Sequence, residues 1–330
     1  MKWVKRLSLA FLGLVLVVFA LMGYLYATRG TPTRSVYAFG DPLGPPVIGD
    51  STFLRSIELL TKTDLTRGHT VEPLFNGNGT YPRLWQDLRA ATRTIVLQLY
   101  YCKPGAVADS LKRILLDRAR AGVRTYLLFD AFGAQDISDA YKDSLRSVGV
   151  RVADFRPVKW YSLHKAQHRS HIRVVAVDGQ IGYTGGFGLA DVWLGDGHTK
   201  EQWRETNVRF TGTAVRQLLA AFSAAWAEAT GELLTGRFAF DNADTDSVGA
   251  LAGLLHAEPA VGSTVAERFL ALTLTGARKT LYVTNAYFVP DDVFRHIRCN
   301  PAGKLKAFSF RARAKSPDRP AKARTQVERH

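Results

Sequence analysis

The sequence is poor in the residues that build disulfides and metal sites. Two cysteines, Cys102 and Cys299, do not make a disulfide framework, and neither lies at metal-site spacing from another ligand. The eight histidines include no HExxH or similar cluster. We therefore expect no metal and no cofactor, and we interpret Cys102, at the end of a predicted strand, as a buried thiol.

Acidic residues are fewer than basic ones, and the difference is unevenly distributed along the chain. There are 44 Lys and Arg against 29 Asp and Glu, a net charge of +15. Residues 295–330 hold 11 basic and 2 acidic side chains (+9), so the other 294 residues hold 33 and 27, which is only +6. A body so close to neutral argues against nucleic acid as a partner. The apolar share of 46% allows one large domain or two modest ones.

Charge is absent from residues 7–26, a run that follows Lys2, Lys5 and Arg6. As a helix rising ~1.5 Å per residue, it would span about 30 Å, the thickness of a bilayer core. We predict that residues 1–28 are a transmembrane anchor, with a cleaved signal peptide as the alternative. The basic flank favours a single-pass topology with the N-terminus inside and the body on the extracytoplasmic side.

Strand-like and helix-like segments alternate after a linker over residues 29–50 that is rich in Gly, Pro and Thr. Such alternation indicates parallel β-α-β units, so we predict an α/β fold. We expect a turn at Asn76–Gly79. The expected strands are 94–101, 123–129, 150–155 and one ending at Phe210, and the expected helices are 84–91, 107–121 and 213–230.

A strand–turn–strand unit follows these segments. Residues 173–177 are mostly apolar and β-branched, Asp178-Gly179 signals a tight turn, and residues 181–184 form the returning strand. Side chains two residues apart on a strand share a face, so His171 and Arg173 point the same way. The imidazole and guanidinium, with the backbone N–H groups of Gly185-Gly186, suit a phosphate.

This HxR-x4-D pattern resembles the HxKxxxxD signature of the phospholipase D superfamily, in its cardiolipin-synthase-like branch. Arg173 stands where the family normally has Lys, and Gly188 where Asn often follows the glycine pair. The segments TIVLQLYYCKPG, AGVRTYLLFDAFG and SVGVRVADFRP also resemble the first half of the family. The resemblance implies a phospholipase D-like mixed sheet flanked by helices, which we place in residues 51–240.

The resemblance also implies a mechanism that uses two copies of the signature. One histidine attacks phosphorus and forms a phosphohistidine, and the other protonates the leaving alkoxide. Carried over, His171 is the nucleophile or the acid, Arg173 clamps the phosphate, and Gly185 and Gly186 bind it. Asp178 is then a buried residue that orients the site, and the alternative is that it only forms the hairpin turn.

An internal repeat extends this resemblance. Thr94–Tyr101 matches Thr280–Tyr287 at an offset of 186, and TNAYFVPDD resembles the opening of the family's second half. We predict that residues 241–294 begin a second, incomplete repeat, since its histidine would fall near 357, past residue 330. Residues 295–330 lack periodicity and are predicted to be a basic disordered tail, either an arm for anionic lipid headgroups or an unfolded extension.

Three functions remain open at this point. The first is a membrane-associated phosphatidyltransferase or phosphodiesterase acting on phosphatidylglycerol-like lipids, with a homodimer bringing two copies of His171 together. The second is a truncated, catalytically inactive membrane protein. The third is a dimeric, single-signature nuclease, which the anchor and the near-neutral body disfavour.

Overall fold

The computed structural model describes residues 2–28, 33, 35–37, 46–157, 170–236, 248–257, 264–285, 298–299 and 307–312. The chain divides into two compact units, and each is described by itself. One unit combines Met1–Thr63 with Leu255–His330, and the other is Asp64–Leu254. The domain boundaries expected from the sequence stay predictions.

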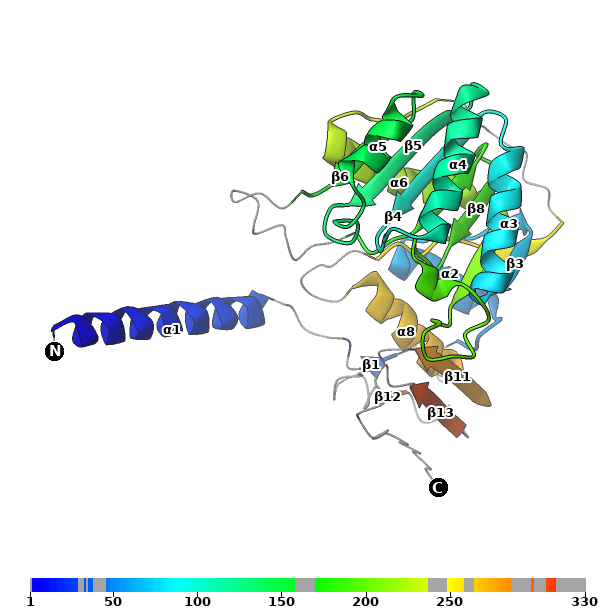
Figure 1. Ribbon diagram of the computed structural model, residues 1–330. Helices are drawn as coiled ribbons and strands as arrows, with labels where there is room; N and C mark the ends of the chain where they lie inside the picture. Colours follow the sequence, from blue (N-terminus) through cyan, green and yellow to red (C-terminus); the bar gives the residue numbers. More distant parts are fainter. Residues whose placement is uncertain are drawn as a thin grey trace. The chain divides into compact units, whose positions relative to one another are not determined.

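A seven-stranded mixed sheet forms the centre of the Asp64–Leu254 unit (Figure 1). Its strand order is β3-β9-β8-β7-β4-β5-β6. Strands β4, β5 and β6 run parallel, whereas the other neighbours pair antiparallel. The strands are β3 Val71–Phe75, β4 Thr94–Leu99, β5 Arg124–Asp130, β6 Arg151–Phe155, β7 Val174–Val177, β8 Ile181–Thr184 and β9 Thr206–Thr211.

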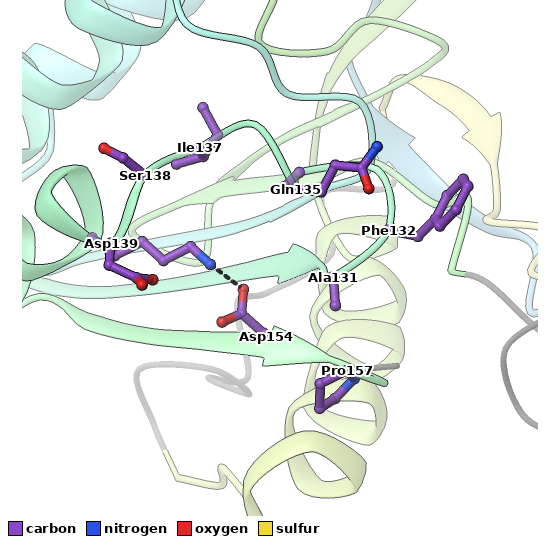
Figure 2. A pocket seen from close by; sticks show the side chains of 10 residues that line it. Ala131, Phe132, Gln135, Ile137, Ser138, Asp139, Asp154 and Pro157 are labelled. Atoms are coloured by element: carbon purple, nitrogen blue, oxygen red, sulfur yellow. Dashed lines mark hydrogen bonds and ion pairs between the residues drawn. The ribbon is translucent and has the colours of Figure 1, made fainter. Parts of the chain in front are cut away.

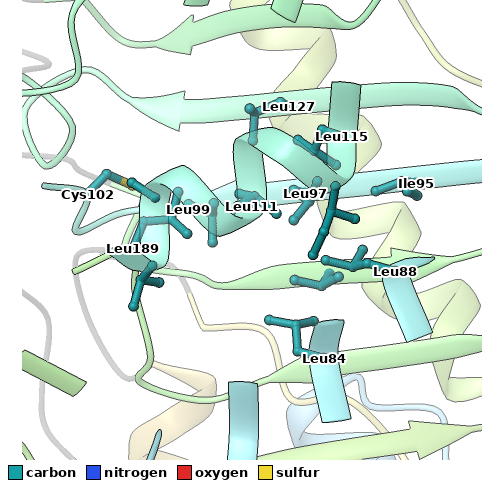
Figure 3. Packing of buried hydrophobic residues seen from close by; sticks show 14 of the residues in the cluster. Leu84, Leu88, Ile95, Leu97, Leu99, Cys102, Leu111, Leu115, Leu127 and Leu189 are labelled. Atoms are coloured by element: carbon teal, nitrogen blue, oxygen red, sulfur yellow. The ribbon is translucent and has the colours of Figure 1, made fainter. Parts of the chain in front are cut away.

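Helices cover both faces of this sheet. The helices α3 (Asn76–Ala90), α4 (Ala106–Arg120) and α5 (Asp139–Arg146) lie on one face, and α6 (Ala214–Thr230) lies on the other (Figure 1). Strand β4 shows why: Ile95 and Leu97 belong to the core under α3 and α4, whereas Val96 belongs to the core under α6. Figure 3 shows the first of these cores. The predicted α/β fold, a mixed sheet flanked by helices, is confirmed.

The predicted β7–β8 hairpin is present. Val177 pairs with Ile181. Asp178 and Gly179 have φ values of 53° and 69°, the left-handed conformation that Asp and Gly tolerate in tight turns. Cys102 lies beyond β4 as a free, fully buried thiol, and burial raises its pKa to about 12. Its predicted role as a plain buried thiol is confirmed.

The predicted turn at Asn76–Gly79 is wrong, because α3 already begins at Asn76. Asn76 donates from Nδ2 to the carbonyl of Asp196 (2.7 Å) and accepts at Oδ1 from the amide of Glu205 (3.1 Å). At Gly77, any Cβ would overlap the carbonyl of Trp193. The glycine therefore permits close packing against a distant loop, a need that local sequence patterns do not reveal.

The other unit contains α1 (Lys2–Thr28), α2 (Ser51–Thr61) and α8 (Val265–Gly276). Within α1, Trp3–Ala27 has a mean hydropathy of 2.4 and is long and apolar enough to cross a membrane. Helix α2 packs on α8, where Arg268 donates to the carbonyl of Leu60 (2.6 Å). Strand β11 (Thr280–Asn285) pairs in parallel with β13 (Ala307–Ala312).

Two short pairings complete the described structure. Strand β1 (Ser35–Val36) pairs with β12 (Arg298–Cys299), and β2 (Thr66–His69) pairs with β10 (Ala250–Ala252). Strands β12 and β13 lie in the segment predicted to be a disordered tail. The rest of that tail, and residues 286–294 of the proposed second repeat, fall outside the described residues.

Candidate active site

The predicted site lies at one edge of the seven-stranded sheet. Tyr100 follows β4, Asp130 ends β5, and Gly185 follows β8, whereas His171 and Glu205 precede β7 and β9. Since β7 and β9 run antiparallel to β8, the starts of β7 and β9 lie at the same edge as the ends of β4, β5 and β8. The topology thus gathers these residues from five strands.

His171 and Arg173 contact each other at the centre of this edge. Arg173 Nη1 lies 2.8 Å from His171 Nδ1 and donates to the carbonyl of His171 at 2.7 Å. Arg173 Nε donates to the carbonyl of Phe187 at 3.0 Å. The Arg173 residue is only 5% exposed, whereas His171 remains exposed to solvent. The shared face predicted for the two side chains is therefore present.

Burial and a neighbouring cation favour the uncharged form of this histidine. Partial burial lowers the pKa of His171, the charge of Arg173 lowers it further, and Asp130 acts in the opposite direction. Tyr100 lies against the imidazole, with the ring centroids 4.3 Å apart, and the Arg173 guanidinium lies 5.5 Å from the same tyrosine ring. The imidazole thus lies against an aromatic ring and beside a cation.

Two buried side chains fix the backbone just before His171. Asp130 Oδ2 accepts from the amide of Ser170 at 3.2 Å, and Gln98 Nε2 donates to Ser170 Oγ at 2.6 Å. Asp130 and Gln98 are each 1% exposed. Asp130 also caps its own loop by accepting from the amides of Phe132 and Gly133. Residues of β4 and β5 thus hold Ser170, which directly precedes the histidine.

The glycine pair lies against two side chains from the start of β9. A Cβ at Gly185 would overlap the amide of Asn207, and a Cβ at Gly186 would overlap the carboxylate of Glu205. Burial raises the pKa of Glu205, while the Thr206 amide and Arg173 partly offset this effect. The glycines thus make room for Asn207 and Glu205, and their predicted role in phosphate binding stays a prediction.

Asp178 is not brought together with His171 and Arg173. It lies in the β7–β8 turn, at the opposite end of β7 from His171. Seven residues of extended chain span up to about 23 Å. Its carboxylate accepts from the amides of Thr92 (2.9 Å), Arg93 (2.7 Å) and Thr94 (2.8 Å). The alternative interpretation, a residue that forms the hairpin turn, agrees with this geometry.

A hollow of about 470 Å³ opens where β5 and β6 end, lined there by Ala131 and Pro157 (Figure 2). Lys142 and Asp154 form an ion pair at 2.7 Å in its wall. Its other lining residues include Phe132, Gln135 and Pro157. Residues 158–169, which hold His164, Lys165 and His168, lie outside the described residues.

Sequence reasoning missed Glu205, Asn207 and Gln98. Glu205 directly precedes β9 and Asn207 is its second residue, and the sequence pattern of this segment predicted a strand but no functional site. Gln98 is a polar residue inside an otherwise apolar strand, and that break in the pattern was the one local signal available. No group of three or more His, Cys, Asp or Glu side chains that could hold a metal ion occurs among the described residues.

Comparison with known proteins points to one superfamily. The chain is 32% identical over 221 residues to a cardiolipin synthase of Geobacillus kaustophilus, covering 66% of this chain and 44% of that protein. It is 30% identical over 244 residues to cardiolipin synthase A of Pseudomonas syringae, covering 72% of this chain and 50% of the relative. The chain thus spans about half the length of these curated relatives. No family model matches it.

Solved structures give weaker similarities. A phosphatidylserine synthase from Haemophilus influenzae aligns with 74% of this chain and 62% of its own, at 12% identity and a TM-score of 0.48. The phospholipase D family member Nuc from Salmonella typhimurium aligns with 49% of this chain and 96% of its own, at 14% identity and a TM-score of 0.36. The family assignment rests on the sequence matches and on the signature. This chain belongs to the phospholipase D superfamily and is related to cardiolipin synthases.

Proposed function

We propose that this chain is a phospholipase D-type phosphatidyltransferase or phosphodiesterase that acts on phosphatidylglycerol-like lipids. The observation that carries the proposal is the contact between the exposed imidazole of His171 and the buried guanidinium of Arg173. Relatives named cardiolipin synthase support the choice of a glycerophospholipid. Both groups suit a phosphodiester, since an imidazole can attack phosphorus and a guanidinium binds its oxygens.

The proposed reaction needs two histidines. One attacks phosphorus, the bond from phosphorus to the leaving alcohol breaks, and a phosphohistidine forms. The second histidine gives the leaving alkoxide a proton, then takes one from the acceptor alcohol or water, which attacks the phosphohistidine and frees the first. His171 is the signature histidine of the described site, so a homodimer would supply the second copy.

We also propose that α1 anchors the chain in a membrane. Its apolar span, Trp3–Ala27, carries lysine and arginine only near its N-terminal end, at Lys5 and Arg6. This arrangement supports an N-terminus inside and a body on the extracytoplasmic side. Addition of protease to intact cells tests the orientation. The body should be digested from outside, and a body that survives until the cells are lysed contradicts the proposed topology.

Turnover of phosphatidylglycerol by the purified full-length chain in detergent micelles tests the activity. His171→Ala should abolish turnover, whereas His198→Ala should leave it intact, since the His198 side chain is 70% exposed and pairs with Asp196 at 3.6 Å. The mass of the protein in solution is recorded for each sample. Turnover by a dimer that is lost in His171→Ala supports two assembled half-sites.

The same experiment separates the alternatives. A folded monomer without turnover would contradict the proposal and favour the catalytically inactive protein. Cleavage of DNA at low salt, lost in His171→Ala and without any lipid turnover, would instead favour the nuclease.

A further inference from the structure

The guanidinium of Arg173 is directed at the histidine. Nη1 lies 2.8 Å from His171 Nδ1 and 2.7 Å from the carbonyl of His171, and Nε is bonded to the carbonyl of Phe187. Arg173 is 5% exposed, so these contacts are shielded from solvent. In the substrate-free chain, Nη1 and Nε are therefore engaged by the protein itself.

This contact determines which imidazole nitrogen carries the proton. A guanidinium has only donors, and arginine keeps its charge at neutral pH even where burial lowers its pKa, as at Arg173. His171 Nδ1 must therefore accept the hydrogen bond with its lone pair. The neutral imidazole then holds its hydrogen on Nε2.

Neither nitrogen is reactive in that state. An imidazole attacks phosphorus with a lone pair, but the lone pair of Nδ1 is bonded to Arg173 and Nε2 carries a hydrogen. Loss of the Nε2 proton from a neutral ring would leave an imidazolate, so the ring is no useful acid. A second proton on Nδ1 would set an imidazolium directly against the guanidinium.

We propose that Arg173 is a positioning residue that holds His171 in the Nε2–H tautomer and so keeps it unreactive in the substrate-free site. Reaction requires the guanidinium to leave Nδ1, and this consequence rests on the proposed function. A phosphodiester oxygen can draw the guanidinium away because a charge-assisted hydrogen bond to phosphate is stronger than one to a neutral ring.

The proposal also predicts how Arg173 differs from the lysine that the family normally has at this position. The ammonium nitrogen of a lysine ends one bond short of the position of an arginine Nη atom. A lysine at residue 173 would keep its charge near the carbonyl of Phe187 but would fall short of His171 Nδ1. Arg173→Lys should therefore release the histidine without removing the cation.

Nitrogen-15 NMR of the full-length chain in detergent micelles, labelled at histidine, tests the tautomer directly without any substrate. The His171 signals are identified by their loss in His171→Asn. We expect an unprotonated, hydrogen-bonded Nδ1 and a protonated Nε2 in the wild type. In Arg173→Lys we expect loss of the single form and a mixture of tautomers, while His198 keeps its signals.

A proton on Nδ1 of the wild-type His171 would overturn the proposal, and so would an unchanged His171 spectrum in Arg173→Lys. Arg173→Met, which also lacks Nη1 but fills a similar volume, gives the same comparison if the lysine variant does not fold. The NMR experiment measures the tautomer of His171 and not turnover. A chain without activity would therefore contradict the proposed function but not the assignment of the tautomer.

Discussion

Asp178 Oδ1 accepts a hydrogen bond from the backbone amide of Thr94 at 2.8 Å, so the signature aspartate is tied to the start of β4. His171 lies at the other end of β7. The aspartate thus joins the hairpin turn to the neighbouring central strand. The spacing between His171 and Asp178 in the signature reflects the length of β7. The strand places the histidine at one end of the sheet and the aspartate in the hairpin turn at the other.

Asp178→Asn should therefore act on stability. The variant places an amide NH₂ among backbone and hydroxyl donors, so we expect a loss of about 1–3 kcal/mol in the free energy of unfolding. Urea unfolding in micelles measures it, with the exposed Asp117→Asn as control. A shifted His171 tautomer in folded Asp178→Asn would contradict this assignment.

The same carboxylate should make stability depend on pH. Burial tends to raise the pKa of Asp178, but the hydrogen bonds from Thr94, Thr92 and Arg93 together bring it below its ordinary value of 3.8. Its stabilising contribution is therefore complete above the unfolded pKa and is lost as the pH falls through the lower, folded value. The gap in unfolding free energy between wild type and Asp178→Asn should shrink over that acid range. A constant gap would show that the charge contributes nothing.

The two glycines of the pair should tolerate alanine differently. Gly185 has a φ of +148°, and an added Cβ would lie 2.9 Å from the Cα of Asn207. Because backbone cannot move aside cheaply, Gly185→Ala should cost about 2 kcal/mol or more. At Gly186 the obstacle is the end of the flexible Glu205 side chain, so Gly186→Ala should cost about 1 kcal/mol. Urea unfolding compares them.

A double-mutant cycle tests the second half of this prediction. In the background of Glu205→Ala, the cost of Gly186→Ala should fall, because the carboxylate that the new Cβ meets is gone. An equal cost in both backgrounds would show that Glu205 does not limit this position.

Asp87 and Arg209 form a buried ion pair beneath α3. Arg209 Nε lies 2.6 Å from Asp87 Oδ2, and both side chains are about nine-tenths buried. Tyr183 donates from its hydroxyl to the same carboxylate. Asp87→Ala leaves a buried guanidinium without its main partner and should cost about 3–5 kcal/mol.

The exposed pair of Asp143 and Arg146 in α5 is the matched control. Asp143→Ala should cost less than about 1 kcal/mol, since solvent screens that pair. Similar losses for the two variants in urea unfolding would show that burial adds nothing at Asp87.

The titration of His171 should follow the groups that face it. Arg173 lowers its pKa and Asp130 raises it, while burial beside Tyr100 and Arg173 is the largest lowering effect. We expect an NMR midpoint below 6.5, shifted upward in Arg173→Met and downward in Asp130→Asn. An unshifted midpoint in Arg173→Met would contradict the electrostatic role of the guanidinium.

The sequence predicted the helices and strands whose formation depends on patterns among neighbouring residues. Helix α4 followed from its apolar stripe, and the β7–β8 hairpin followed from Asp178-Gly179 between two apolar runs. His171 and Arg173 were expected to share a face from the period of a strand, and they do contact each other, although both precede β7, which begins at Val174. Backbone geometry repeats every two or three to four residues, so such features can be read from neighbouring positions.

Tertiary structure alone decided what surrounds His171. Asp130, Gln98 and Glu205 come from three separate strand ends, and Asn76 begins a helix because a loop 120 residues away accepts its amide. The amino-acid sequence by itself determined the family, the α/β sheet and the two residues of the central contact. The direction of the Arg173 guanidinium and the distance of Asp178 from His171 required the packed sheet, because both depend on which strands lie side by side.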